Sequence, residues 1–142
     1  MKKMILMLGL ILSTACLAPV AYAAHAGSIM AALMSARENL VAMVDAPDAA
    51  SQNQYYAEVT TASQAVDDAV ATALADANLT PEQAAKLEEF KATWEAFKDT
   101  RENEIMPQVR AGNVEQAKSV AMGIQAERMA TMKSLLAELG AQ

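Results

Sequence analysis

Three arginines lie inside apolar stretches of the sequence, and their chemistry is the first candidate for a function. Arg101 continues an aromatic series where an apolar residue is expected, Arg128 interrupts a similar series near the C-terminus, and Arg37 lies midway along an apolar segment. A guanidinium group facing a groove binds a carboxylate through two parallel hydrogen bonds. The pattern is also typical of arginines that pack along an apolar seam and pair with a neighbouring acid, such as Glu102 or Glu104 beside Arg101. We take the three arginines as candidate ligand-binding residues.

The composition leaves little room for catalytic chemistry. The one Cys and the one His both fall within the first 25 residues, so a nucleophile activated by histidine is disfavoured. The sequence has no Gly-rich phosphate-binding loop and no Glu-x-x-His motif of the kind that di-metal bundles use. A formal net charge of −6 would repel the phosphates of nucleic acid. We expect a protein that is not an enzyme, has no metal or cofactor, and binds no nucleic acid.

Methionine and histidine offer an alternative ligand set. Met30 with Met34, and Met129 with Met132, form pairs on single helix faces, and His25 is expected near the same end of the fold. Thioethers and an imidazole are suitable ligands for copper(I), or for a non-covalently bound haem. Methionine also fills irregular cores, and this chain has only 4% aromatic residues with which to build one. We therefore interpret the methionines first as core residues.

The elements that must position these side chains are helices. After residue 24 the sequence is rich in Ala, Glu, Lys and Gln and shows no extended period-two alternation, which predicts an all-α chain. Three breaks divide it into helices at about 27–45, 48–77, 81–111 and 114–139. A proline inside the third helix, Pro107, removes one backbone hydrogen bond and predicts a bend near residues 103–106.

The breaks carry helix-capping residues. Asp48 is expected to cap the second helix, and Thr80 with Gln83 forms the capping-box pattern at the start of the third. Gly112 is suited to the left-handed conformation that ends a helix, and Asn113 is expected to cap the fourth helix. Connections this short join antiparallel neighbours only.

Each helix carries one apolar stripe. Its spacing averages 3.5 residues, which is typical of near-parallel helices in a left-handed supercoil. We therefore predict an up-down-up-down antiparallel four-helix bundle. The stripes are Tyr56, Val59, Ser63, Val66, Val70, Ala73 and Ala77 in the second helix; Leu87, Phe90, Trp94, Phe97, Ile105 and Val109 in the third; and Val114, Ala117, Ala121, Ile124, Met132, Leu135 and Leu139 in the fourth.

The first 23 residues have the pattern of a secretory signal. Two lysines precede an apolar stretch, and Ala21 and Ala23 provide the small residues that a signal peptidase recognises. We expect export to the periplasm, with residues 1–23 as signal peptide and 24–142 as the bundle. Two alternatives remain: lipidation at Cys16, and retention of the segment as an inner-membrane anchor. Retention would explain why the first helix, if cut after Ala23, is shorter than the second.

A family resemblance is carried by the third and fourth helices. Trp94-Glu95-Ala96-Phe97, followed by Arg101 and Ile105 and then by Ala111-Gly112-Asn113-Val114-Glu115-Gln116-Ala117, resembles the extracytoplasmic four-helix-bundle sensor domain of methyl-accepting chemotaxis proteins. The resemblance covers about residues 79–139. It implies a small-molecule sensing module that works as a homodimer. Receptors of that family continue into a signalling region beyond their fourth helix, whereas this sequence stops at Gln142, so a membrane receptor is a further expected partner.

A second motif keeps another class of function open. Leu79-Thr80-Pro81-Glu82-Gln83 matches the Leu-Thr-x-x-Gln motif of small exported helical chaperones. The alternative to a ligand-sensing module is therefore a periplasmic helical stress chaperone or interaction protein without a small ligand. We expect the sensing module, with a small ligand, an anion if the arginines bind it, held between helices or across a dimer seam.

Overall fold

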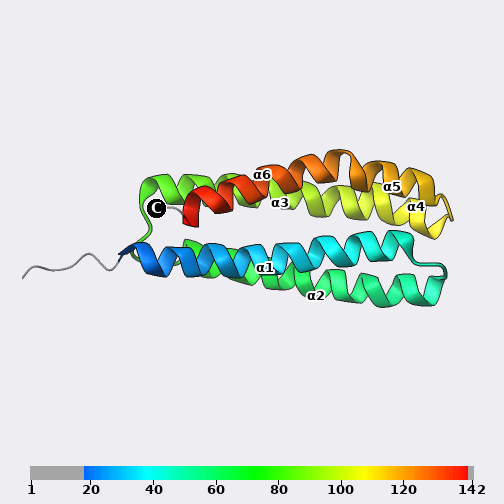
Figure 1. The fold of residues 1–142 in the computed structure, drawn as a ribbon, viewed down its shortest axis with the longest axis horizontal. Coiled ribbons are helices and arrows are strands. Elements are labelled where there is room, and N and C mark those ends of the chain that lie inside the picture. Colours follow the sequence, from blue (N-terminus) through cyan, green and yellow to red (C-terminus); the bar gives the residue numbers. More distant parts are fainter. Residues whose placement is uncertain (1–17, 141–142) are drawn as a thin grey trace, which may run out of the picture.

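A computed structural model describes residues 18–140, with side chains from Tyr22 onward, and this part of the chain is almost entirely helical. Figure 1 shows the helices as two hairpins lying side by side. The elements are α1 (Ala18–Asp45), α2 (Ala49–Leu74), α3 (Pro81–Thr100), the π-helical turn η1 (Arg101–Ile105), α4 (Met106–Arg110), α5 (Val114–Met122) and α6 (Ile124–Gly140).

The helices form an antiparallel four-helix bundle, as predicted. The continuous run α3–η1–α4 acts as the third helix and α5–α6 as the fourth, so the chain goes up, down, up and down along one axis (Figure 1). α1 packs along α2, while α6 packs on both α3 and α1. α2 and α3 pack less closely on each other than the other neighbouring pairs do.

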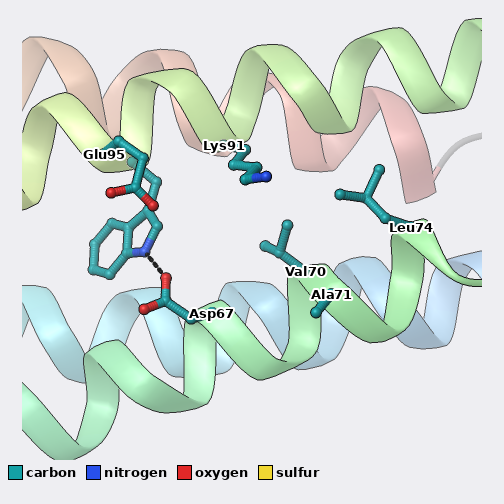
Figure 2. A pocket seen from close by; sticks show the side chains of 7 residues that line it. Asp67, Val70, Ala71, Leu74, Lys91 and Glu95 are labelled. Atoms are coloured by element: carbon teal, nitrogen blue, oxygen red, sulfur yellow. Dashed lines mark hydrogen bonds between the residues drawn. The ribbon is translucent and has the colours of Figure 1, made fainter.

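Most residues of the predicted stripes lie in the core, together with residues of α1. Trp94 and Phe97 are buried and stack with ring centroids 5.4 Å apart, and with Phe90 they are the largest side chains of a mainly aliphatic interior. The Trp94 indole N–H donates a hydrogen bond to Asp67 Oδ1 at 2.7 Å, so this buried ring has a partner for its polar group (Figure 2). Tyr56 and Val114 are only half-buried, and Ala77 is exposed beyond the end of α2.

Most of the predicted caps are confirmed. Asp48 accepts a hydrogen bond from the Ser51 backbone N–H at 2.8 Å, and Thr80 and Gln83 form a complete capping box. Gly112 has φ 77°, a conformation that side chains with a Cβ rarely adopt. The prediction for Asn113 was wrong in its chemistry, because its side chain donates to Gln108 Oε1 and does not cap α5.

The first helix begins earlier than predicted, at Ala18. With 28 residues it is about 42 Å long, which matches the 26 residues of α2. Tyr22 is buried in the core and packs edge-on against His25. Part of the expected signal segment therefore belongs to the bundle; the expected cleavage point itself stays a prediction. Within residues 18–140, no helix combines the length and apolar character needed to cross a bilayer.

The bend predicted at Pro107 takes the form of a π-helical turn. In η1 the Met106 backbone N–H donates to the carbonyl of Arg101, five residues back. A proline ring collides with the carbonyl four residues before it and offers no N–H, and the wider turn accommodates both effects. The extra residue brings Arg101, Ile105 and Met106 all to the buried side.

The fourth helix is interrupted at Gly123, which the sequence did not predict. Gly123 separates α5 from α6, and its N–H donates to Ser119 O. The interruption rotates the apolar stripe, so Ile124 is 43% exposed while Gln125 is fully buried. The expectation that Ile124 belongs to the core was therefore wrong, because a fixed helical period does not continue across the break.

Replacing Gly123 by alanine is expected to destabilise the bundle. A Cβ there would lie 2.8 Å from the Ser119 carbonyl oxygen, so the backbone would have to shift to avoid a clash. The cost of such overpacking is about 1–3 kcal/mol. Gly27→Ala is the matched control, because a Cβ at Gly27 meets nothing within 4 Å and helix propensity favours alanine there by about 1 kcal/mol. Urea unfolding of both variants measures the difference, and equal stabilisation by the two changes would contradict the close contact.

Candidate functional site

The three arginines singled out above lie at three different seams of the bundle. Arg101 points toward α2, Arg128 toward α3, and Arg37 toward the α5–α6 junction, as their hydrogen bonds show. What distinguishes them is how completely their guanidinium groups are satisfied within the fold.

Arg101 is buried and already has partners. Its Nη1 donates to Ser63 Oγ at 2.7 Å, and its Nε donates to Glu102 Oε1 at 2.7 Å. Glu102 also accepts from the Tyr56 hydroxyl at 3.0 Å, and burial together with this bond raises the pKa of Tyr56 above its usual value. The prediction that Arg101 pairs with Glu102 is confirmed, and the guanidinium links α2 to the π-helical turn.

Arg128 joins α6 to α3. Its Nη1 donates to Thr100 Oγ1 at 2.7 Å and to Gln125 Oε1 at 3.0 Å. Gln125, fully buried, donates through Nε2 to the backbone carbonyl of Phe97 at 2.8 Å. Polar groups buried beside the π-helical turn thus satisfy one another, which is the condition for burying them without a large penalty.

Arg37 is different because its guanidinium lacks a strong acceptor. Nη1 is buried and has no hydrogen-bond partner in the described part of the chain, while Nη2 donates at 3.5 Å to the Met122 thioether, a weak acceptor. Burial lowers the pKa of Arg37 below its usual value, so the fold disfavours the charged form. A buried charge without an acceptor is the arrangement that an anion would relieve.

A groove of about 260 Å³ opens beside Arg37, between α1 and α6. Ala126 and Ala130, one helical turn apart, leave the space free on α6, and Lys133 adds a second cation. Met34 and Met129 supply apolar walls. Because the lining has two cations and no carboxylate, it suits a small anion with an apolar part. The sequence reasoning missed Lys133, although the small residues at i and i+4 followed by a lysine were the available signal.

The alternative metal ligands lie in different surroundings. His25 Nε2 lies 3.2 Å from Asp76 Oδ2, Met132 is fully buried, and Met34 and Met129 line a groove whose two cations would repel copper(I). Among residues 18–140, no cluster of three or more His, Cys, Asp or Glu side chains has the arrangement of a metal site.

These features define a class: a four-helix bundle with a polar layer through its interior and a cation-lined groove on one seam. The chain belongs to the family described as "Four helix bundle sensory module for signal transduction", whose model matches residues 21–142. The resemblance to chemoreceptor sensor domains is therefore confirmed at the level of the family. The match begins inside the early part of α1, in agreement with the burial of Tyr22. Comparison with curated proteins and with solved structures gives no match.

Replacing Arg101 by methionine is expected to lower stability by about 3 kcal/mol, because it removes one partner from a buried, hydrogen-bonded charge network. Methionine retains much of the apolar stem, so the loss reports the polar contacts. Arg110→Met is the control, since Arg110 is exposed, and a surface change of this kind is expected to stay within about 0.5 kcal/mol. Chemical denaturation of both variants provides the comparison; indistinguishable midpoints would show that the Arg101 network adds nothing to stability.

Proposed function

We propose that this protein is a sensory input module that binds a small carboxylate ligand in the groove between α1 and α6. The observation that carries the proposal is the state of Arg37, which lines an open groove and whose buried Nη1 has no acceptor within residues 18–140. Arg101 and Arg128 are proposed to contribute indirectly, because their contacts hold the π-helical turn against α2 and α6 against α3.

The chemistry of the lining favours a carboxylate over a neutral ligand. A carboxylate accepts both Nη1–H and Nη2–H of one guanidinium, and the bond to Met122 is weak enough to be exchanged. Lys133 adds a second, more flexible positive charge to the same groove. The thioethers of Met34 and Met129 adapt their shape to an apolar substituent.

The groove lies next to an exposed apolar edge, which supports a homodimer as the working form. Met122 and Ile124, at the α5–α6 junction, are 55% and 43% exposed. Burying such side chains against a second copy would remove apolar surface from water and cover the mouth of the groove. The module is expected to act by binding its ligand and not by catalysing a reaction.

We further propose that the module works outside the cytoplasm, delivered by the N-terminal segment. The burial of Tyr22 supports the form in which that segment stays attached to α1 and anchors the bundle at the inner membrane. A membrane receptor is the expected partner for passing on the signal.

Arg37→Met is expected to stabilise the ligand-free protein, by about 1 kcal/mol. The pKa of Arg37 is lowered because burial disfavours its charged form. An apolar side chain of similar length avoids the free-energy cost of burying that charge. The sign is opposite to the one expected for Arg101→Met. Thermal unfolding at pH 7 measures both, and a destabilised Arg37→Met protein would mean that the guanidinium has a structural partner after all.

Ligand binding is tested by thermal unfolding with succinate, citrate, L-aspartate and benzoate, each at ionic strength matched with NaCl. A ligand at 100 times its dissociation constant stabilises the fold by about 2.7 kcal/mol, which is several degrees for a chain of this size. Arg37→Gln and Lys133→Gln are expected to abolish the shift. Sedimentation velocity of the same samples shows whether the binding species is a dimer.

The control for charge is Arg110→Gln, which removes one cation away from the groove and is expected to retain the wild-type shift. Putrescine, a cation, is expected to give none. If all four anions leave the folded protein unshifted, the ligand-sensing proposal fails and the interaction-protein alternative gains support. A shift that survives in Arg37→Gln would place the ligand elsewhere.

A further inference from the structure

Met122 is the exposed methionine of the described chain. It is the last residue of α5, next to the helix break at Gly123, and its side chain is 55% exposed. Within residues 18–140 every other methionine is buried or half-buried, and Met129 and Met132 lie in the core. An oxidant must reach the thioether sulfur to convert it into a sulfoxide. Met122 is therefore the described methionine that a dissolved peroxide reaches first.

The exposed thioether is also in contact with the least satisfied cation of the fold. The Met122 sulfur lies 3.5 Å from Arg37 Nη2, and a thioether is a weak hydrogen-bond acceptor. Nη1 of the same guanidinium is buried and has no acceptor within residues 18–140. Burial of the charged group lowers the pKa of Arg37 below its usual value. A strong acceptor placed at this sulfur would therefore meet a cation that needs one.

A sulfoxide provides such an acceptor. Oxidation converts an apolar thioether into a polar group, whose oxygen lies one bond from the sulfur. A hydrogen bond from a charged guanidinium to such an oxygen is about twice as strong as one between neutral groups. Because the sulfur already lies beside Nη2, a side-chain rotation of Met122 is enough to bring its oxygen to the donor.

We propose that Met122 is a reversible oxidation site, whose sulfoxide oxygen accepts a hydrogen bond from Arg37 and so competes with a ligand for the guanidinium. The competition rests on the function proposed above, whereas the oxidation and the new hydrogen bond do not. In this account an oxidant weakens carboxylate binding by giving Arg37 an internal partner.

The oxidant is a peroxide, and the reaction is a transfer of one oxygen atom. The sulfur lone pair attacks one oxygen of hydrogen peroxide; the S–O bond forms as the O–O bond breaks, and hydroxide leaves. The proton on the transferred oxygen passes to the hydroxide, which gives water. Sulfur loses two electrons and the peroxide gains them. Methionine sulfoxide reductases reverse the change, taking electrons and protons from two thiols that become a disulfide and releasing the oxygen as water.

The test compares thermal unfolding of the full chain before and after treatment with hydrogen peroxide, without ligand. Peptide mass spectrometry is expected to find added oxygen on Met122 before Met129 and Met132. The sulfoxide is expected to raise the unfolding temperature by about 3 °C, because a charge-assisted hydrogen bond replaces a weak contact. Oxidised methionine ordinarily disrupts a fold, so the sign is diagnostic. Reduction by methionine sulfoxide reductase with dithiothreitol is expected to restore the original temperature.

Three variants assign the effect to the two side chains. Met122→Leu receives the same peroxide treatment and reports what oxidation of the other methionines does, with no rise expected. Arg37→Met keeps the oxidation site but loses the donor, so oxidation at Met122 is expected without a rise. Met122→Gln carries an amide oxygen and is expected to raise the unfolding temperature without any oxidant. Protein is kept at low micromolar concentration, because the proposed homodimer would cover Met122.

Any of three results in the ligand-free protein would overturn the proposal: oxidation of Met122 no faster than that of the buried methionines, an unchanged or lowered unfolding temperature after oxidation of Met122, or an equal rise in Arg37→Met. Carboxylate binding is then measured with the four anions named above, and oxidation is expected to weaken it about tenfold. Equal binding before and after oxidation would refute the competition and leave the proposed function standing. If no anion binds the reduced protein, the proposed function fails, and the ligand-free unfolding still decides whether the sulfoxide pairs with Arg37.

Discussion

A missing backbone N–H at Pro107 governs much of this bundle. It is accommodated by the π-helical turn at Arg101–Ile105, which adds one residue to the buried face of the third helix. Polar side chains then lie where a regular heptad would place apolar ones. These polar side chains have hydrogen-bond partners from other helices: Ser63 from α2, and Gln125 and Arg128 from α6. The break at Gly123 belongs to the same adjustment, because it turns Gln125 inward to face the third helix.

The hydrogen-bond partners of the three arginines distinguish structural residues from the candidate ligand contact. A buried guanidinium with good acceptors holds helices in register, and Arg101 and Arg128 have such acceptors. Arg37 faces a thioether and open space instead, and burial disfavours its charge. Natural proteins accept such local instability where a ligand supplies the missing partner. The contrast in environment, rather than residue type, is what makes Arg37 the best candidate for a ligand contact.

Two grooves on the bundle arise from the same shortage of large side chains. The chain has few aromatic residues, and alanines leave space at two seams: Ala126 and Ala130 between α1 and α6, and Ala71 between α2 and α3. On the α1–α6 seam the space is lined by two cations and flexible thioethers. On the α2–α3 seam the lining combines apolar side chains with Lys91 and two carboxylates, Asp67 and Glu95 (Figure 2). The spaces at the two seams therefore differ in charge.

Local sequence was enough to predict the helices, most of their caps, their antiparallel order and the irregularity at Pro107, because each depends on residues within one or two turns of each other. The capping box of Thr80 and Gln83 and the left-handed conformation of Gly112 depend on local sequence alone. Only the tertiary structure shows which arginine has strong acceptors, because Ser63 and Thr100 reach Arg101 and Arg128 from helices distant in sequence, while Arg37 Nη1 has no acceptor within residues 18–140. It also shows that Ile124 is exposed. Periodicity predicts on which side of its helix a residue lies. Packing between helices determines which side chains of other helices that residue contacts.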